Sequence, residues 1–355
     1  MPDARARHPG KESSPISELA SVNFDVASSE LPHNLESAES AGGTSGASGT
    51  SAAARFAFTP APSAADALQF TRELAESHYE NFSVVSLLLP AELRQDFCNI
   101  YAFCRIADDL GDEIPGGDEA LKALDRFRAE LRDCYAGSAS AAVFVALKQT
   151  IDKHQIPIDP FLDLIAAFEQ DQRIKRYDTF EQLCDYCTRS ANPVGRLVLY
   201  VCGYRDTQRQ HYSDQTCTAL QLANFWQDVR RDLADLDRIY LPKDSMARFG
   251  VTEQQLRDSR LDDNYRALIK FEVDRTEKMF DEGDKLLPML DPTVRRHIAL
   301  FGMGGRAVLE AIRRQDFDTL SRRPTLSSIQ KGKLAARAAA NGLLGKLAGA
   351  RRTAL

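Results

Sequence analysis

The stretch that decides the fold reads Leu93-Arg-Gln-Asp-Phe97-Cys-Asn-Ile100-Tyr-Ala-Phe-Cys104. Its apolar residues recur three and four positions apart, which is the period of one face of an α-helix. The same period continues through long stretches from residue 64 to about 323, whereas alternating strand patterns closed by Asn-Gly or Asp-Gly turns are nearly absent. Proline and glycine fall mostly between these stretches. The sequence therefore predicts one all-α domain.

Composition divides the chain into three parts. We expect residues 1–62 to be a disordered extension, because 15 of the 18 residues from 37 to 54 are Ser, Ala or Gly and offer little apolar surface. The helical pattern fills residues 63–325, the predicted domain. Residues 326–355 form a basic tail, with six Lys or Arg residues and no acid between 331 and 355. Such a tail suits peripheral contact with anionic lipid, and the alternative is a solvated tail whose glycines weaken any helix.

Charge, hydropathy and cysteine content narrow the setting of the protein. The formal net charge of −6 gives no reason to expect nucleic acid as a partner. No apolar run approaches the ~20 residues that span a bilayer, and the first residues lack the apolar core of a secretory signal. Seven cysteines, an odd number, are then expected as reduced thiols. These properties predict a cytoplasmic protein, placed by its tail on the inner face of the membrane.

One acidic cluster ends the helix that begins near residue 91. It reads Arg105-Ile-Ala-Asp108-Asp109-Leu-Gly-Asp112-Glu. Asp108 and Asp112 are four residues apart and share a face with Arg105, and like charges at that spacing destabilise an isolated helix by roughly 0.2–0.5 kcal/mol. A bound cation would compensate. The alternative is a solvated acidic helix end that Arg105 partly neutralises.

A second polar stripe lies within Gln221-Leu-Ala-Asn224-Phe-Trp-Gln-Asp228-Val-Arg-Arg-Asp232. Side chains at Asn224, Asp228 and Asp232 repeat every four residues, so they drift only about 40° per step around a helix. Gln221 extends the stripe by one turn. The two following arginines fall off the stripe, whereas an ordinary solvated face would more often include basic residues.

Together the two acidic faces predict a magnesium and diphosphate site. Mg²⁺ prefers oxygen ligands and is usually held by one or two carboxylates together with substrate phosphates. The implied chemistry is ionisation of an allylic or similar diphosphate, with metal ions and arginines stabilising the departing anion. The carbocation that remains needs an apolar, water-poor cavity.

These motifs resemble the squalene/phytoene synthase family, and the resemblance runs from about residue 69 to 323. It implies an all-α isoprenoid-synthase bundle with a central cavity. It implies Mg²⁺ and diphosphate binding by the acidic and amide residues, with Asp109 close to them, and further diphosphate or ligand contacts from arginine, glutamine and tyrosine side chains. A tyrosine near the reacting carbons is also implied. The residues so assigned are Asp108, Asp112, Asn224, Asp228 and Asp232 for the metal, Arg105, Gln221, Arg238, Tyr240 and Arg322 for the diphosphate, and Tyr186 for the cavity.

Two departures resemble the hydroxysqualene synthase branch of this family. Tyr79 and Asn81 stand where head-to-head synthases usually have a Ser-rich segment, and the run from Ser190 to Gly195 has Asn and Pro where most members carry small apolar residues. The branch takes presqualene diphosphate, releases diphosphate and lets water capture the rearranged cation. The resemblance implies presqualene diphosphate or a related prenyl diphosphate as substrate, Mg²⁺ as cofactor, no nicotinamide, and neighbouring pathway enzymes as partners. Tyr79 and Asn81 are expected at the substrate.

Several interpretations stay open at this point. A complete squalene or phytoene synthase that starts from two prenyl diphosphates is the nearest alternative, although the departure at Tyr79 and Asn81 weakens it. A non-catalytic helical partner subunit is another, and it would be expected to lose an acid from one face. We expect Asn192 to position the water that captures the cation. The alternative for Asn192 is a buried structural amide at a helix end.

Overall fold

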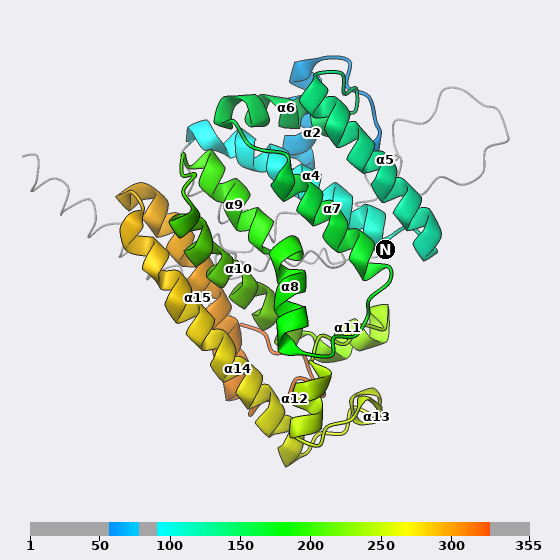
Figure 1. Ribbon diagram of the computed structural model, residues 1–355, viewed down its shortest axis with the longest axis vertical. Helices are drawn as coiled ribbons and strands as arrows, with labels where there is room; N and C mark the ends of the chain where they lie inside the picture. Colours follow the sequence, from blue (N-terminus) through cyan, green and yellow to red (C-terminus); the bar gives the residue numbers. More distant parts are fainter. Residues whose placement is uncertain (1–56, 78–90, 327–355) are drawn as a thin grey trace, which may run out of the picture.

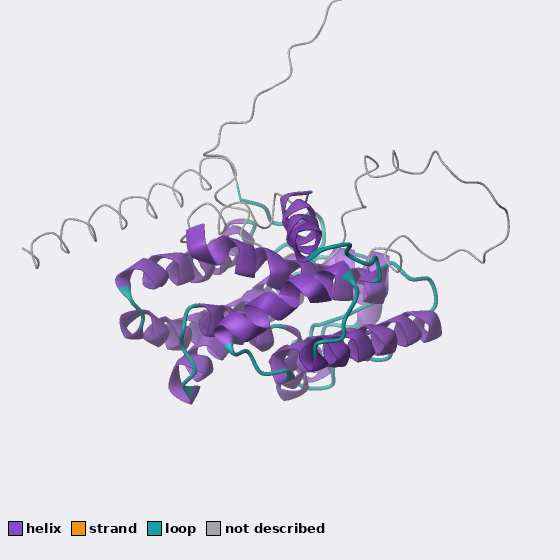
Figure 2. Ribbon diagram, turned by 90° about the horizontal axis from the view of Figure 1, so that it is seen from above, coloured by secondary structure: helices purple, strands orange, loops and turns teal. Residues whose placement is uncertain are grey.

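The computed structural model describes residues 57–77 and 91–326. Within these ranges the regular elements are helices, and the only β pairings are isolated bridges between Pro60 and Ala141 and between Arg176 and Ile239. Figure 2 shows helices joined by loops throughout this part of the chain. The predicted all-α class is confirmed.

Figure 1 labels the helices in chain order. They are α2 (Ala64–Ser77), η2 (Ala91–Leu93), α4 (Arg94–Asp112), α5 (Gly117–Ala136), α6 (Ala142–His154), α7 (Asp159–Asp171), α8 (Phe180–Ser190), α9 (Asn192–Val201), α10 (Thr207–Gln227), α11 (Val229–Leu236), α12 (Lys243–Arg248), α13 (Glu253–Arg257), α14 (Asp263–Gly283), η3 (Asp284–Met289) and α15 (Pro292–Arg314).

Local sequence signals set many of these helix ends. The side chains of Thr179, Asp206 and Asp262 accept hydrogen bonds from backbone N–H groups in the first turns of α8, α10 and α14, which satisfies donors that a helix start leaves open. Proline occupies the first turn of α7, α9 and α15, where its missing N–H costs nothing. Gly137 ends α5 with a φ of 82°, a conformation that glycine adopts without strain.

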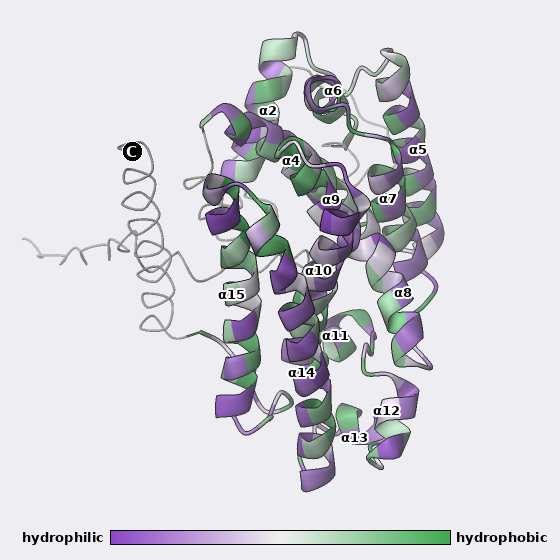
Figure 3. Cartoon of the chain, turned by 60° about the vertical axis from the view of Figure 1, so that its left-hand side comes forward, coloured by the Kyte–Doolittle hydropathy of each residue, from purple (hydrophilic) through white to green (hydrophobic). Residues whose placement is uncertain are grey.

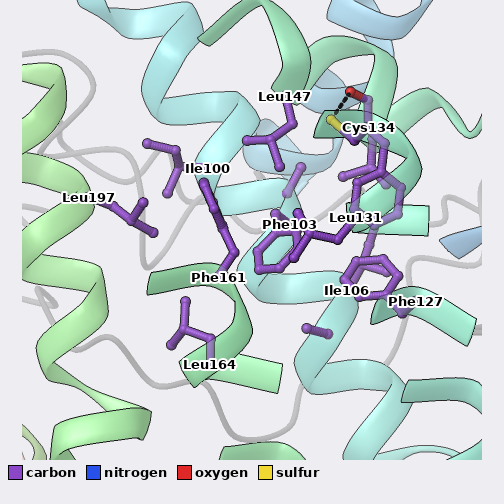
Figure 4. Close-up of a cluster of buried hydrophobic side chains, with 14 of the residues drawn as sticks. Ile100, Phe103, Ile106, Phe127, Leu131, Cys134, Leu147, Phe161, Leu164 and Leu197 are labelled. Carbon is purple, nitrogen blue, oxygen red and sulfur yellow. Dashed lines mark hydrogen bonds between the residues drawn. The ribbon is translucent and has the colours of Figure 1, made fainter. Parts of the chain in front are cut away.

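Two apolar cores hold the bundle together. The first core lies among α4, α5, α6, α7 and α9, where Phe103 packs against Phe127 and Phe161 with ring centroids 5.2 and 4.9 Å apart. Figure 4 shows these rings with the surrounding leucines and the hydrogen bond that Cys134 Sγ donates to the backbone of α6. Figure 3 shows hydrophilic and hydrophobic residues alternating along outer helices such as α5, as expected when one face is solvated.

The second core surrounds α10, which packs against α9, α14 and α15. Trp226 is fully buried there, and its indole N–H donates to Thr276 Oγ1 of α14 at 2.9 Å. Phe280 and Tyr265 of α14 are also fully buried. Because α4 belongs to the first core and α10 to the second, the two acidic faces end up on opposite sides of the space between the cores.

Residues 57–62 differ from their predicted place in the disordered extension. The backbone of Thr59 accepts a hydrogen bond from Ala142 N at 2.8 Å, and Ala61 N donates to Ser140 O at 3.2 Å. Ala57 is fully buried in the first core. Composition could not show this, because the segment is ordered by pairing with a loop some 80 residues later. The predicted extension over 1–56 and the basic tail over 327–355 lie outside the described residues.

None of the helices in the described ranges is long and apolar enough to cross a membrane.

Candidate active site

The two predicted acidic faces meet at one cavity. Asp108 and Asp112 in the last two turns of α4 line it from one side, and Asn224, Asp228 and Asp232 line it from the other. The cavity has a volume of about 770 Å³ and is also lined by α7 and α8. The helices thus bring together five side chains that the sequence separates by more than 110 residues.

Asp108 is held where a negative charge is costly. It is only 4% exposed, and burial raises its pKa well above the ordinary value, with the carboxylates of Asp112 and Asp109 adding to the rise. Three acids within five residues on a buried helix end favour a bound cation, because a cation would offset both the burial and the mutual repulsion.

Arg105 serves the neighbouring acid rather than the cavity. Its guanidinium lies 2.7 Å from Asp109 and 4.0 Å from Asp108, and both Arg105 and Asp109 are buried. Burial raises the pKa of Asp109 to about 7, although Arg105 opposes the rise. Among the described residues, neither of the two lines the cavity. Arg105 therefore supports the α4 face from behind.

The second stripe is bent, which corrects the prediction of one continuous helix. Asp228 has φ −108° and ψ 15° and separates α10 from α11. Its N–H still bonds Asn224 O, and its C=O still accepts from Asp232 N, both at 2.9 Å, so the three side chains stay in line. The break coincides with contacts from residues 320–324: Gln227 Nε2 donates to Pro324 O at 2.6 Å. Pattern analysis cannot detect a break that distant residues accompany.

Each acidic face has an arginine from a distant segment. Arg238 Nη2 lies 3.1 Å from Asp112 Oδ1, and Arg323 makes a two-point pair with Asp228, with distances of 2.5 and 2.9 Å. The sequence assigned this role to Arg322, whose side chain is exposed, and the structure places the adjacent Arg323 at the acid instead. Adjacent arginines in a loop point in different directions, so spacing alone could not choose between them.

An aromatic wall lines the cavity between the acidic faces. The rings of Phe225 and Tyr240 are stacked 3.6 Å apart at 7°, and Tyr186 packs on Tyr240 with centroids 6.1 Å apart. All three residues line the cavity, so Tyr186 and Tyr240 lie where the sequence predicted them. Burial raises the pKa of both tyrosines, which keeps their hydroxyls protonated.

Asp171 is the site residue that the sequence analysis missed. It ends α7, lines the cavity and accepts a hydrogen bond from Tyr186 Oη at 2.9 Å. Burial raises its pKa to about 7, and Arg238 is the main group that opposes the rise. One signal was available: Asp171 follows Leu164 and Phe168 at helical spacing, so an acid ends an apolar face. A lone acid at a helix end is too common to single out.

A second, apolar cavity adjoins the acidic one. It has a volume of about 710 Å³ and is lined by α8, α9, α10, η3 and α15. Both cavities share the lining residues Ser190, Val194, Gln221 and Asn224. Gln221 and Asn224 therefore stand at the junction between an acidic chamber and an apolar chamber.

Asn192 lies behind this junction. It is 4% exposed at the start of α9, its Oδ1 accepts a hydrogen bond from Thr218 Oγ1 at 2.8 Å, and it is not among the described residues that line either chamber. This contact is the one expected of a buried structural amide, and a catalytic role for Asn192 stays a prediction. The predicted substrate residues Tyr79 and Asn81 lie outside the described residues.

The donor set suits ions shared with a diphosphate. No group of three or more His, Cys, Asp or Glu side chains in residues 57–77 and 91–326 is arranged to hold an ion without other ligands. The two faces instead offer separate carboxylates and one amide around a common cavity, together with two arginines. Mg²⁺ commonly takes one or two carboxylates and fills its remaining positions with phosphate oxygens and water.

The helical bundle and its cavity define the class of this protein as an all-α isoprenoid synthase. A family model described as squalene/phytoene synthase matches residues 75–330, and the chain belongs to this family. Its members are isoprenoid synthases that act on prenyl diphosphates.

Three known proteins illustrate the similarity. Phytoene synthase of Arthrospira platensis is 30% identical over 285 residues, which cover 77% of this chain and 92% of the relative. The solved structure of squalene synthase HpnC from Alicyclobacillus acidocaldarius is 48% identical with a TM-score of 0.69, covering 72% of this chain and 96% of that one. A dehydrosqualene synthase in complex with ligand is 25% identical with a TM-score of 0.71, covering 78% and 96%.

Proposed function

We propose that this protein converts presqualene diphosphate to hydroxysqualene in a Mg²⁺-dependent reaction that releases diphosphate, a step towards squalene and hopanoids. The observation that carries the proposal is the higher identity to squalene synthase HpnC than to the phytoene and dehydrosqualene synthases. The run from Ser190 to Gly195, which resembles the hydroxysqualene synthase branch, supports the same choice.

The acidic chamber would hold the diphosphate end of the substrate. Asp108, Asp112, Asn224, Asp228 and Asp232 offer the oxygen ligands for Mg²⁺, which when bound neutralises the diphosphate and makes it a better leaving group. Arg238 and Arg323, which lie at these acids, would face the same anion and stabilise the charge that grows as the C–O bond breaks.

The apolar chamber would hold the hydrocarbon. Both electrons of the broken bond leave with the diphosphate, so a carbocation remains in a space whose lining is mostly apolar. The stacked faces of Tyr186, Tyr240 and Phe225 lie beside the acidic chamber and carry the negative face of the ring quadrupole, which stabilises a nearby cation. Apolar walls keep bulk water from the cation, so its rearrangement can precede capture.

Product analysis tests the proposal. Purified protein is incubated with presqualene diphosphate and Mg²⁺, with and without NADPH, and the extracts are analysed by mass spectrometry. We expect hydroxysqualene in both reactions and diphosphate release in equal amount. A product that is squalene, formed only with NADPH, would contradict the proposal.

The relatives named phytoene synthase favour a second candidate, a complete synthase that starts from two prenyl diphosphates. Incubation with farnesyl or geranylgeranyl diphosphate alone separates the two. A C30 or C40 hydrocarbon from these substrates identifies the complete synthase. If no substrate releases diphosphate, the protein is a non-catalytic helical partner.

A further inference from the structure

Ser190 stands at the junction of the two chambers. It is the last residue of α8, lies one helical turn beyond Tyr186, and lines both the acidic and the apolar chamber. Residues four apart share a helix face, so Ser190 continues the face on which Tyr186 meets the cavity. A hydroxyl at this position can reach toward either chamber by rotation about one bond.

The Ser190 hydroxyl has no hydrogen-bond partner within the described part of the chain, although its oxygen is buried. Other polar side chains of the apolar chamber differ in this respect. Thr216 Oγ1 donates to Tyr212 O, and among the described residues that line this chamber only Ser190 has a buried side-chain oxygen or nitrogen without a partner. A buried hydroxyl without a partner is costly and is retained where it serves a ligand or a water molecule.

We propose that Ser190 holds the water molecule that captures the carbocation, and so determines that the product is an alcohol. The inference rests on the proposed function and adds a residue to it. The position suits the task because the water would sit between the apolar chamber, where the cation lies, and the acidic chamber, where the diphosphate has just been released. Asn192 is less suited, because its amide oxygen is already engaged by Thr218.

The step balances without a further reactant. Water donates a lone pair to the cationic carbon and a C–O bond forms. The resulting oxonium loses a proton, which passes to the diphosphate in the neighbouring chamber, directly or through the Ser190 hydroxyl. The sum is hydrolysis of the diphosphate ester to an alcohol and hydrogen diphosphate, with no change of oxidation state and no need for a nicotinamide.

The test measures diphosphate release and product identity separately for Ser190→Ala. Presqualene diphosphate, Mg²⁺ and ¹⁸O-labelled water are supplied to the full-length protein. We expect diphosphate release within about threefold of the wild type, while the ratio of labelled alcohol to hydrocarbon and rearranged products falls about tenfold, the effect of one hydrogen bond on a partition. Ser190→Thr, which keeps a hydroxyl, should restore most of the alcohol.

Ser213→Ala is the matched control, because Ser213 lines the apolar chamber but lies away from the junction; its alcohol ratio should equal that of the wild type. An unchanged ratio in Ser190→Ala overturns the inference. Equal loss of diphosphate release and alcohol also overturns it, because that result indicates a structural role. If the wild type forms no alcohol at all, the proposed function itself fails, which is a different result from failure at Ser190 alone.

Discussion

Asp108 and Asp228 are the single residues on which the metal assignment depends most directly, because each lies on a different acidic face. We expect Asp108→Ala and Asp228→Ala each to lower turnover by several orders of magnitude, since neither face alone completes the coordination of shared ions. Helical circular dichroism should not change. Asp185→Ala, an exposed acid of α8 paired with Arg189, is the control and should retain activity. Near-normal turnover in either test variant contradicts the assignment.

Glu272 should make stability depend on pH. It is fully buried on α14 and paired with Arg275, with Asp244 as the other nearby charge, and burial raises its pKa to about 7. The folded protein therefore binds this proton more tightly than the unfolded chain, in which the pKa is about 4.3. Stability from this group is present below about pH 4.5 and is lost as the pH rises through 7, by roughly 3 kcal/mol at most.

Chemical denaturation between pH 5 and 8 measures this dependence. We expect Glu272→Gln to unfold with a smaller loss of stability over that range than the wild type, because an amide does not titrate. Glu282→Gln, an exposed acid on the same helix paired with Lys285, should keep the wild-type slope. Equal slopes in Glu272→Gln and wild type would show that the buried carboxyl is already ionised at pH 5.

Residue spacing predicted only part of the site. Carboxylates four apart on a helix necessarily share a face, so Asp108 with Asp112, and Asn224 with its following acids, could be grouped from the sequence. Asp171 and Arg323 could not, because neither belongs to a local pattern. Asp171 acquires its role from Tyr186 of the next helix, and Arg323 acquires its role from an acid 95 residues earlier.

The segment after α15 is the element that completes the second acidic face. Arg230 Nη1 donates to the backbone oxygens of Leu320 and Ser321, and Arg323 pairs with Asp228. In the absence of substrate, Arg323 and a divalent ion compete for the same carboxylate. We expect Arg323→Ala to bind Mn²⁺ roughly fivefold more tightly, because a partly exposed ion pair contributes about 1 kcal/mol.

Mn²⁺ titration followed by electron paramagnetic resonance measures this affinity without any turnover. Arg322→Ala removes the same charge from the adjacent, exposed position and serves as the matched control. Identical Mn²⁺ affinities for the two variants would show that the pair with Asp228 does not compete with metal.

The close approach of α10 and α14 depends on a glycine. A Cβ on Gly283 would lie 3.0 Å from Thr216 N and 3.2 Å from Thr216 Cα, and backbone atoms cannot move aside as a side chain can. We expect Gly283→Ala to lower the free energy of unfolding by about 1–3 kcal/mol, the usual cost of overpacking. Gly302→Ala in α15 is the control, because its Cβ would meet only Asp284 Oδ1 at 3.6 Å and alanine favours the helix. Thermal unfolding of both variants decides the matter.

Helices were predictable at this scale, and their interruptions were not. The period of three and four that begins at Leu93 is a local property, so it indicates α4 without knowledge of the fold. The break at Asp228 has no such signal, because no proline or glycine lies between Gln221 and Asp232. It is seen only where the segment of residues 320–324 crosses the helix.

The whole molecule handles a C30 substrate whose hydrocarbon partitions into lipid, so contact with a bilayer would shorten its path. The basic tail lies outside the described residues, and its composition alone supports membrane contact. We expect salt-sensitive binding to anionic liposomes that falls when the chain is truncated after Gln330, with activity on detergent-solubilised substrate retained. Vesicle co-sedimentation measures this. Undiminished binding by the truncated protein would exclude the tail as the anchor.

Synthesis proceeds from the N-terminus, and the strap of residues 320–324 is therefore made after every helix that it touches. While the chain is still being translated, α4 and α10 can already pack, yet Asp228 meets no guanidinium from the strap. The nascent protein consequently carries an extra uncompensated negative charge at its cavity, in which cellular divalent ions are the available counterions. Release from the ribosome thus coincides with a change in the ionic state of the pocket, and maturation of the enzyme ends at its catalytic centre.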